Sequence, residues 1–135
     1  MEIKERQLEG IRILDLKGSL VAGEACQLLR ETALVGEETK PRVVMNLAEV
    51  DYIDSSGLGS LVNCFTTLER WGGGLRILNP SERDMELMVL TKLSTVFQVF
   101  NNEQDSVNSF FPARELKKFD ILNFVQEQRK LKEGK

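Results

Sequence analysis

The chain has 135 residues, a length typical of one domain, and 41% of them are hydrophobic and 29% charged. A formal net charge of −3 disfavours general nucleic-acid binding. The absence of histidine excludes Ser-His-Asp and Cys-His nucleophile pairs and the two-His zinc helix. Two cysteines, Cys26 and Cys64, are too few for a disulfide framework and are expected to be reduced and buried. With no apolar signal core and no run of ~20 apolar residues, we expect a cytoplasmic, non-enzymatic protein without a membrane span, metal or cofactor.

The first third of the chain predicts a β-hairpin followed by a helix. Two runs of alternating apolar and charged residues, 3–8 and 11–16, are separated by a two-residue turn that contains glycine. Gly18 is expected to end the second strand. Residues 23–35 have a helical pattern, and Gly36 supplies a C-terminal stop.

The middle of the chain predicts a buried strand, a helix and a second strand. Residues 43–47 form a short β-branched run that suits a central strand covered on both faces. A short connection follows. The next helix has a core-facing stripe at Leu58, Leu61, Val62, Phe65 and Leu68, with Asn63, Thr66, Thr67 and Arg70 elsewhere on the wheel. Three glycines at 72–74 end this helix, and residues 75–78 predict a strand.

The next segment predicts two more helices around a fifth strand. Ser81 and Asp84 have near capping-box spacing, and the helix that they begin carries Met85, Met88, Val89 and Leu93. Residues 95–100 suit a strand, and residues 101–111 suit a short helix stopped by Pro112. Strands that alternate with helices indicate an α/β fold. We expect a mixed, mostly parallel sheet of about five strands with four helices packed on it.

Residues 113–135 differ from the rest and are predicted to form a C-terminal helical extension of a domain that spans residues 1–112. Leu116, Phe119, Leu122 and Val125 share one helical stripe, with Ile121 and Phe124 off it. One interpretation is an amphipathic helix that packs on the domain or on a second copy and ends in a frayed tail. A second is a partner-docking or homo-oligomerisation segment. A third is attachment to a membrane surface, against which the short apolar face and mixed charges argue.

One constellation carries chemistry, the run from Asp54 to Gly59 that reads Asp-Ser-Ser-Gly-Leu-Gly. It lies where a predicted strand leads into a helix, and sites form beyond the carboxyl ends of parallel strands. The first turn of a helix offers free N–H groups and partial positive charge, which would stabilise a phosphate on Ser55. Gly57 and Gly59 each cost helix propensity, about 1 kcal/mol, so a close approach is expected to offset it.

Other interpretations of this run are weaker. Asp54 or Ser55 alone would serve as a helix cap, with glycines that permit tight packing. The spacing is not that of a G-x-S-x-G nucleophile, and no histidine supplies a base. A nucleotide-binding phosphate loop lacks its lysine here. A response-regulator aspartate at Asp51 or Asp54 lacks the acidic pair that would hold a metal.

The sequence resembles STAS domains, the family of bacterial anti-sigma factor antagonists, over residues 3–111. The resemblance rests on four segments: the strand at 43–47, the Asp-Ser-Ser-Gly-Leu-Gly stretch within 51–59, the glycine-led strand at 72–78 and the segment 95–100. It implies the STAS fold. It also implies that Ser55, with Ser56 as second choice, is phosphorylated by a serine kinase of GHKL type that doubles as an anti-sigma factor.

The resemblance further implies a partner switch. The unphosphorylated domain binds the kinase and frees the sigma factor, the phosphorylated domain releases it, and a PP2C-type phosphatase resets the cycle. The residues expected to contact the partner are Asp54, Ser55, Ser56, Gly57, Leu58, Gly59 and Glu24. One position departs from the family: an acidic residue is common where this chain has Val21, and Glu24 lies three residues on.

Two alternatives stay open. The domain would serve as an interaction or scaffold module with a non-sigma role, for example as a lipid-transport subunit, with Ser55 unphosphorylated. Alternatively, it would be a small α/β enzyme or ligand-binding domain, which a large apolar pocket beside Ser55 would favour.

Overall fold

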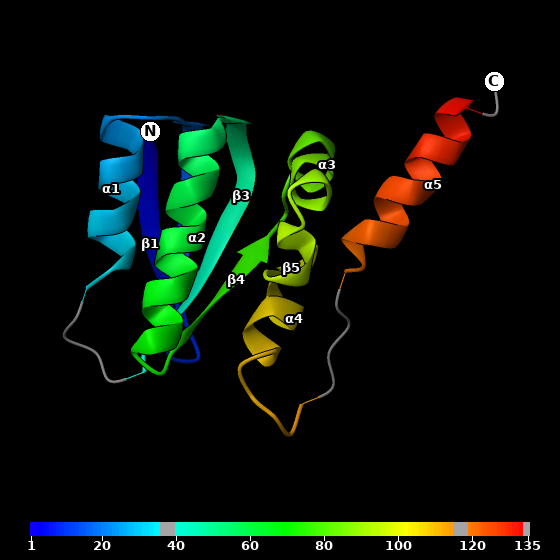
Figure 1. Cartoon of the computed structure of the whole chain (residues 1–135). Helices are drawn as coiled ribbons and strands as arrows, with labels where there is room; N and C mark the ends of the chain where they lie inside the picture. Colours follow the sequence, from blue (N-terminus) through cyan, green and yellow to red (C-terminus); the bar gives the residue numbers. More distant parts are fainter. Residues whose placement is uncertain (36–39, 115–118, 134–135) are drawn as a thin grey trace.

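A five-stranded sheet with helices on both faces forms the framework of the computed structural model, which describes residues 1–35, 40–114 and 119–133 (Figure 1). The strands are β1 Glu2–Leu8, β2 Ile11–Leu20, β3 Arg42–Ile53, β4 Gly74–Leu78 and β5 Gln98–Phe100. The helices are α1 Glu24–Ala33, α2 Ser55–Arg70, α3 Glu82–Leu90, α4 Glu103–Asn108 and α5 Ile121–Glu133, with a 3-10 turn at Leu93–Thr95.

The sheet has the order β1-β2-β3-β4-β5, in which only β1 and β2 pair antiparallel. The predicted hairpin is confirmed. Its two-residue turn has positive φ at both Glu9 and Gly10, as a type I′ turn requires. The predicted mixed, mostly parallel α/β sheet is therefore confirmed. Its parallel strands end at the same side of the sheet, where α1 and α2 both begin (Figure 1).

Two apolar layers hold the sheet between helices. The larger layer lies under α1, α2, α3 and α5 and includes Leu14, Met45 and Leu61, all without exposed surface. The smaller layer lies on the opposite face, where Val44 and Phe100 meet Val107 of α4. At roughly 25 cal/mol per Å² of apolar area removed from water, these layers are the dominant favourable contribution to folding.

Two strands are longer than predicted. Strand β2 continues past Gly18 to Leu20, and β3 continues through what was expected to be a connection to Ile53. The pairing register shifts on both sides of Lys17–Gly18, and Gly18 has a φ of 109°. Such irregularities break the alternation of apolar residues by which a strand is recognised in sequence. Strand β3 therefore leads straight into α2 with only Asp54 between them.

Two predicted elements have different bounds, and a third buries a residue that was expected to lie off its inward face. The fifth strand is confined to Gln98–Phe100, because Leu93–Thr95 form a 3-10 turn. Helix α4 is shorter than residues 101–111, since Asn102 caps its start and it ends at Asn108, before the Pro112 stop. In α2, Thr67 is buried with the core-facing residues although the wheel placed it elsewhere. The predicted stop at Gly36 lies outside the described residues.

The capping box of α3 is confirmed in full. The Ser81 hydroxyl accepts from the Asp84 backbone N–H at 3.0 Å, and the Asp84 carboxylate accepts from the Ser81 N–H at 3.4 Å. Asp84 is only 3% exposed, so this reciprocal pair satisfies groups that water reaches poorly.

The C-terminal segment forms a helix, but with a different inward face from the one predicted. Ile121 and Val125 of α5 are buried in the main core, whereas Leu122 is 47% exposed. Ile121 was placed off the apolar stripe, and that assignment is wrong. Helix α5 packs beside α3 (Figure 1), and Lys132 near its end pairs with Glu82 at 3.0 Å. Leu116 lies outside the described residues.

Candidate functional site

The run from Asp54 to Gly59 lies at the carboxyl end of β3 and forms the start of α2. Asp54 has extended backbone angles, and its Oδ1 accepts from the Gly57 N–H at 2.7 Å. Its backbone carbonyl accepts the first helical bond, from Leu58, at 2.9 Å. Asp54 is therefore the N-cap, and Ser55 and Ser56 are the first two residues of the helix.

Neither serine hydroxyl takes part in capping the helix, because Asp54 does so. Ser55 and Ser56 are exposed, and neither side chain makes a hydrogen bond within the part of the chain that the structure describes. A simple cap needs only Asp54, so capping does not account for the serines. They stand in the first turn, where backbone N–H groups and the helix dipole favour negative charge.

Asp54 also holds the loop after β2. Its Oδ2 accepts from the Ala22 N–H at 3.1 Å, and its own N–H donates to the Leu20 carbonyl at 3.3 Å. Val21, the position that departs from the family, is thereby held beside the start of α2, and its carbonyl accepts from the Cys26 thiol at 3.1 Å. Glu24 is exposed in the first turn of α1, three residues on.

The two glycines of the run have different surroundings. A Cβ on Gly57 would lie 2.1 Å from the Leu20 carbonyl oxygen, whereas a Cβ on Gly59 would meet nothing within 4 Å. Gly57 is buried and permits α2 to approach β2 closely, which is the close approach predicted from the glycines of this run. Gly59 is exposed, and Leu58 is 7% exposed. Of the expected contact residues, Gly57 and Leu58 therefore face inward.

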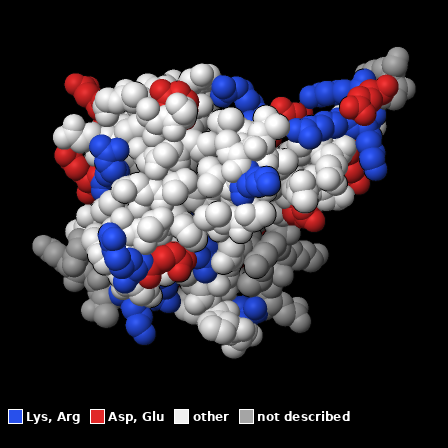
Figure 2. Space-filling model, in the orientation of Figure 1, with Lys and Arg blue, Asp and Glu red and all other residues white. Residues whose placement is uncertain are grey.

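The outer face of α2 is uncharged from its start to Leu68. The helix has no Asp, Glu, Lys or Arg from Ser55 to Leu68, and its exposed residues there are Ser55, Ser56, Gly59, Asn63 and Thr66. Figure 2 shows a wide uncharged area to the left of the centre of the view, with a basic side chain just to the right of the centre and most other charged side chains toward the margins and along α5. Uncharged small residues beside partly buried Val62 and Phe65 make a surface with a low desolvation cost.

The two serines have different neighbours. Ser56 and Ser60 line a hollow of about 370 Å³ between α1 and α2, together with Gln27 and Arg30, and Ser55 does not line it. Arg30 reaches across and donates to the Ser60 hydroxyl at 3.1 Å. This hollow is shallow and polar, so it is not the large apolar pocket that would favour a small α/β enzyme.

Tyr52 and Arg83 were not anticipated from the sequence. The Arg83 guanidinium carbon lies 4.3 Å from the centre of the Tyr52 ring, and Tyr52 is 44% exposed. The pair joins the end of β3 to the start of α3. Tyr52 lies two residues before Asp54 in the chain. The sequence offers one signal for this contact, an aromatic residue two positions before the capping Asp54. It does not reveal the partner, because Arg83 belongs to a separate helix.

The site has an acid-sensitive element. Hydrogen bonds from the N–H groups of Gly57 and Ala22 hold the pKa of the Asp54 carboxyl below its ordinary value. A depressed folded-state pKa contributes stability that is present above the unfolded pKa and lost as pH falls through the folded one. We expect wild type to lose more stability than Asp54→Asn between about pH 6 and about pH 3, measured by urea unfolding. Equal losses in the two proteins would contradict this role of Asp54.

Metal and membrane elements are not found in the described residues. No group of three His, Cys, Asp or Glu in residues 1–35, 40–114 and 119–133 is placed to hold a metal ion. Within the same residues, no helix has the length and apolar character needed to cross a bilayer.

The fold and the site together define a mixed α/β domain whose central helix begins with an exposed serine pair at the carboxyl edge of the sheet. A family model described as "STAS domain" matches residues 2–106, and the chain belongs to that family. It is 33% identical over 105 residues to an anti-sigma-B factor antagonist of Listeria monocytogenes, covering 76% of this chain and 90% of the relative. It is 31% identical over 91 residues to the protein of that name in Bacillus subtilis, covering 64% and 84%.

Solved structures share the fold. The anti-sigma factor antagonist SpoIIAA in its unphosphorylated form superposes with a TM-score of 0.67 at 18% identity, covering 84% of this chain and 100% of that one. SpoIIAA of Bacillus in its phosphorylated form gives 0.61 at 19% identity, covering 80% and 98%. The relatives named as anti-sigma factor antagonists agree with the resemblance in the sequence.

Proposed function

We propose that this chain is an anti-sigma factor antagonist that works by phosphorylation-dependent partner switching at Ser55. Unphosphorylated, it binds an anti-sigma factor that is also a GHKL-type serine kinase. Phosphorylated, it releases that partner until a PP2C-type phosphatase removes the phosphate. The observation that carries the proposal is an exposed Ser55 hydroxyl, without a hydrogen bond to any described residue, at the first position of a helix whose outer face is uncharged as far as Leu68.

The absence of charge on the outer face of α2 explains how a phosphate would act as a switch. Phosphoserine carries about −1.5 to −2 charges at neutral pH. The helix start tolerates that charge within the domain, so the fold need not change. A partner fitted to the neutral face of α2 would instead have to bury the charge or lose contact with it. The added charge also lies beside the Asp54 carboxylate, which increases the repulsion of an acidic partner surface.

The exposed members of the expected contact set are the ones that we propose to touch a partner. Ser55, Ser56, Gly59 and Glu24 are exposed and available to a partner, whereas Gly57 and Leu58 support the backbone from within. Asp54 is partly exposed and holds the loop that contains Val21. Val21 is part of the same surface, so the missing family acid changes which kinase surface fits rather than the phosphorylation site itself.

Names of the relatives support the role. Three relatives above 30% identity, from Bacillus subtilis and two Listeria species, are named anti-sigma-B factor antagonists, and SpoIIAA, at lower identity, has solved structures in phosphorylated and unphosphorylated forms. A regulator of this kind is a binding protein rather than an enzyme and acts in the cytoplasm, where sigma factors work.

The test combines intact mass with binding. Incubation with a panel of GHKL-type kinases and ATP is expected to add one phosphate to wild type and to Ser56→Ala, and none to Ser55→Ala. Ser55→Glu is expected to weaken binding to the cognate kinase by at least about tenfold, a loss of about 1.4 kcal/mol. Ser56→Glu is the matched control, with the same charge one residue on.

Two results would overturn the proposal. Modification that persists in Ser55→Ala would move the site, to Ser56 or elsewhere. Absence of modification by every kinase, with Ser55→Glu binding native partners as well as wild type, would favour the non-sigma scaffold role.

A further inference from the structure

A second hollow lies at the other end of the sheet from Ser55, where β3 and β4 begin. It has a volume of about 550 Å³ and is lined by Lys40, Arg42, Gly72, Gly73, Arg76, Ser109, Phe110 and Pro112. We call it the basal pocket. Among the residues that the structure describes, its lining contains three cationic side chains and no carboxylate.

Two arginines project from neighbouring strands into this end. Arg42 opens β3 and pairs with Gly74, and Arg76 lies two residues further along β4, opposite Val44. The two residues are diagonal neighbours on the same face of two parallel strands, so their long side chains are within reach of a shared ligand. Gly74, which has no side chain, makes space for the Arg76 guanidinium: a Cβ there would lie 3.0 Å from Nη1 of Arg76, 3.2 Å from the Phe110 ring and 3.6 Å from a carboxylate oxygen of Glu69.

The Arg76 guanidinium is fixed in place from several sides. Its Nε donates to the Ser109 hydroxyl at 2.8 Å, and Nη1 donates to the Leu75 carbonyl at 3.3 Å. Its central carbon lies 4.0 Å from the centre of the Phe110 ring. These contacts engage Nε, Nη1 and one face of the group, and among the described residues Nη2 makes no hydrogen bond. A preorganised guanidinium of this kind loses little freedom when an anion binds at Nη2.

The positive charge of this pocket is poorly compensated. Among the described residues, no carboxylate oxygen lies within the 4.0 Å ion-pair distance of Arg42 or Arg76. Burial lowers the pKa of the Arg76 guanidinium from its ordinary value, and the charge of Glu69, at the end of α2, opposes that effect only in part. Arg114 nearby is different, because it forms an ion pair with Glu9 at 2.8 Å.

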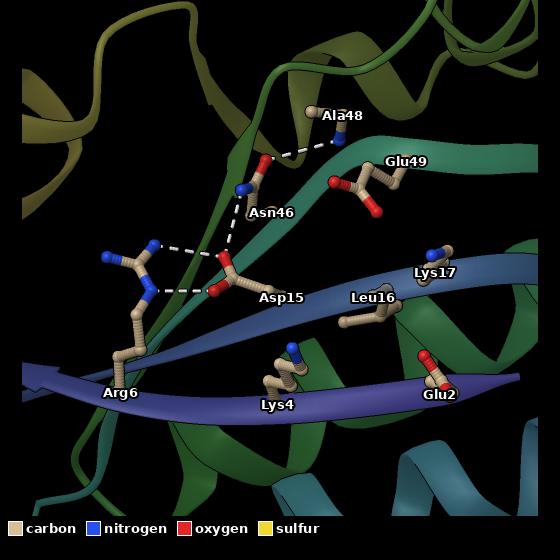
Figure 3. A pocket seen from close by; sticks show the side chains of 9 residues that line it. All are labelled: Glu2, Lys4, Arg6, Asp15, Leu16, Lys17, Asn46, Ala48 and Glu49. Carbon is tan, nitrogen blue, oxygen red and sulfur yellow. Dashed lines mark hydrogen bonds and ion pairs between the residues drawn. The ribbon is translucent and has the colours of Figure 1, made fainter.

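Another hollow with charged side chains shows the contrast. It lies over β1, β2 and β3 on the sheet face that α4 leaves open, and it has a volume of about 400 Å³ (Figure 3). Its three cations, Lys4, Arg6 and Lys17, are matched by three carboxylates, Glu2, Asp15 and Glu49. Arg6 is bound to Asp15 at 2.6 Å, and Asp15 also accepts from Asn46 at 2.9 Å, as Figure 3 shows. That hollow is neutralised from within, whereas the basal pocket is not.

We propose that the basal pocket binds the phosphate group of a small phosphate-bearing molecule, held by the guanidinium groups of Arg42 and Arg76 with Lys40 at the rim. Guanidinium forks match the geometry of phosphate oxygens, and the Ser109 hydroxyl orients one of the forks. Such a ligand would occupy the end of the domain opposite the serine pair, so its binding is independent of the phosphorylation state of Ser55.

Titration of ¹⁵N-labelled protein, followed by amide chemical shifts, tests this site. Inorganic phosphate and AMP are expected to shift the amides of Gly72, Gly73 and Ser109, and adenosine, which has no phosphate, is expected to leave them unmoved. Shifts from both anions with similar affinity indicate that free phosphate suffices; tighter binding of AMP indicates a phosphorylated metabolite. Both results support the site.

Matched double variants separate this pocket from general electrostatics. Arg42→Gln with Arg76→Gln is expected to weaken phosphate or AMP binding by at least about tenfold. Lys4→Gln with Lys17→Gln changes the net charge equally in the neutralised hollow and is expected to change the affinity by less than about twofold. If the glutamine pair fails to fold, Arg42→Lys with Arg76→Lys keeps the charge, removes the planar forks and is expected to weaken binding too. An equal loss in the control pair, or no shift in wild type at ~10 mM anion, would overturn the proposal.

Discussion

Gly57→Ala is expected to lower the free energy of unfolding by about 3 kcal/mol, at the upper end of what overpacking normally costs. The added Cβ would lie 2.1 Å from the Leu20 carbonyl oxygen, a distance at which backbone has to move. Since α2 and β2 are both anchored by fully buried residues such as Leu61 and Leu20, neither element can yield without disturbing the main core. Urea unfolding followed by circular dichroism measures the loss.

The matched control for this variant is two residues away in the same helix. Gly59→Ala adds the same methyl group at an exposed position with nothing within 4 Å, and it is expected to raise stability by about 0.5–1 kcal/mol through helix propensity. Opposite signs for the two alanines would establish that Gly57 holds the helix against the sheet. Similar effects of the two substitutions would disprove it.

Ile121→Ala is expected to lower the free energy of unfolding by roughly 2–4 kcal/mol, as large-to-small changes in cores do. The Ile121 side chain is 4% exposed and belongs to the main core, at the point where α5 meets the domain. Its loss leaves a cavity and removes one of the two buried residues of α5. The same chemical or thermal unfolding measurement reports the change.

Leu122→Ala is the control, since leucine and isoleucine are isomers and the two residues are neighbours. Leu122 is 47% exposed, so its truncation is expected to change stability by less than about 0.5 kcal/mol. The pair tests directly which face of α5 is inward. A larger effect at Leu122 than at Ile121 would restore the stripe predicted from the sequence.

Local signals predicted a large part of the fold. The hairpin turn at Glu9–Gly10, the capping box of Ser81 and Asp84 and the glycines after α2 each specify a backbone conformation within a few residues, and all were recognised. Alternating strands and helices then indicate a mostly parallel sheet. These features are written in residues close together in the chain, which is why sequence is sufficient for them.

Features that depend on distant partners were not predictable. The extension of β3 to Ile53 follows from pairing with β2 around Gly18, and the bulged register hides the alternation of inward residues. The inward face of α5 is set by where α3 and the core lie. Since α5 has apolar residues on several sides, its sequence pattern alone does not show that Ile121 and not Leu122 is buried.

The site shows the same division. Its position at the start of α2 and the need for a close approach by a glycine follow from the run itself. The sequence did not distinguish Gly57 from Gly59, because the carbonyl of Leu20 comes from another strand. Nor did it reveal that the Asp54 carboxylate reaches the Ala22 N–H, 32 residues earlier in the chain.

The position of β5 at the border of the sheet has a consequence for synthesis of the protein. The Val99 carbonyl in this outermost strand accepts from the Phe119 N–H at 3.1 Å, so the segment before α5 covers part of the open edge. A growing chain that has not yet released residue 119 from the ribosome leaves that edge bare, and bare strand edges pair readily with other chains. Chains that stop short of residue 119 therefore expose a strand edge that Phe119 otherwise covers in part, and they are expected to aggregate more readily.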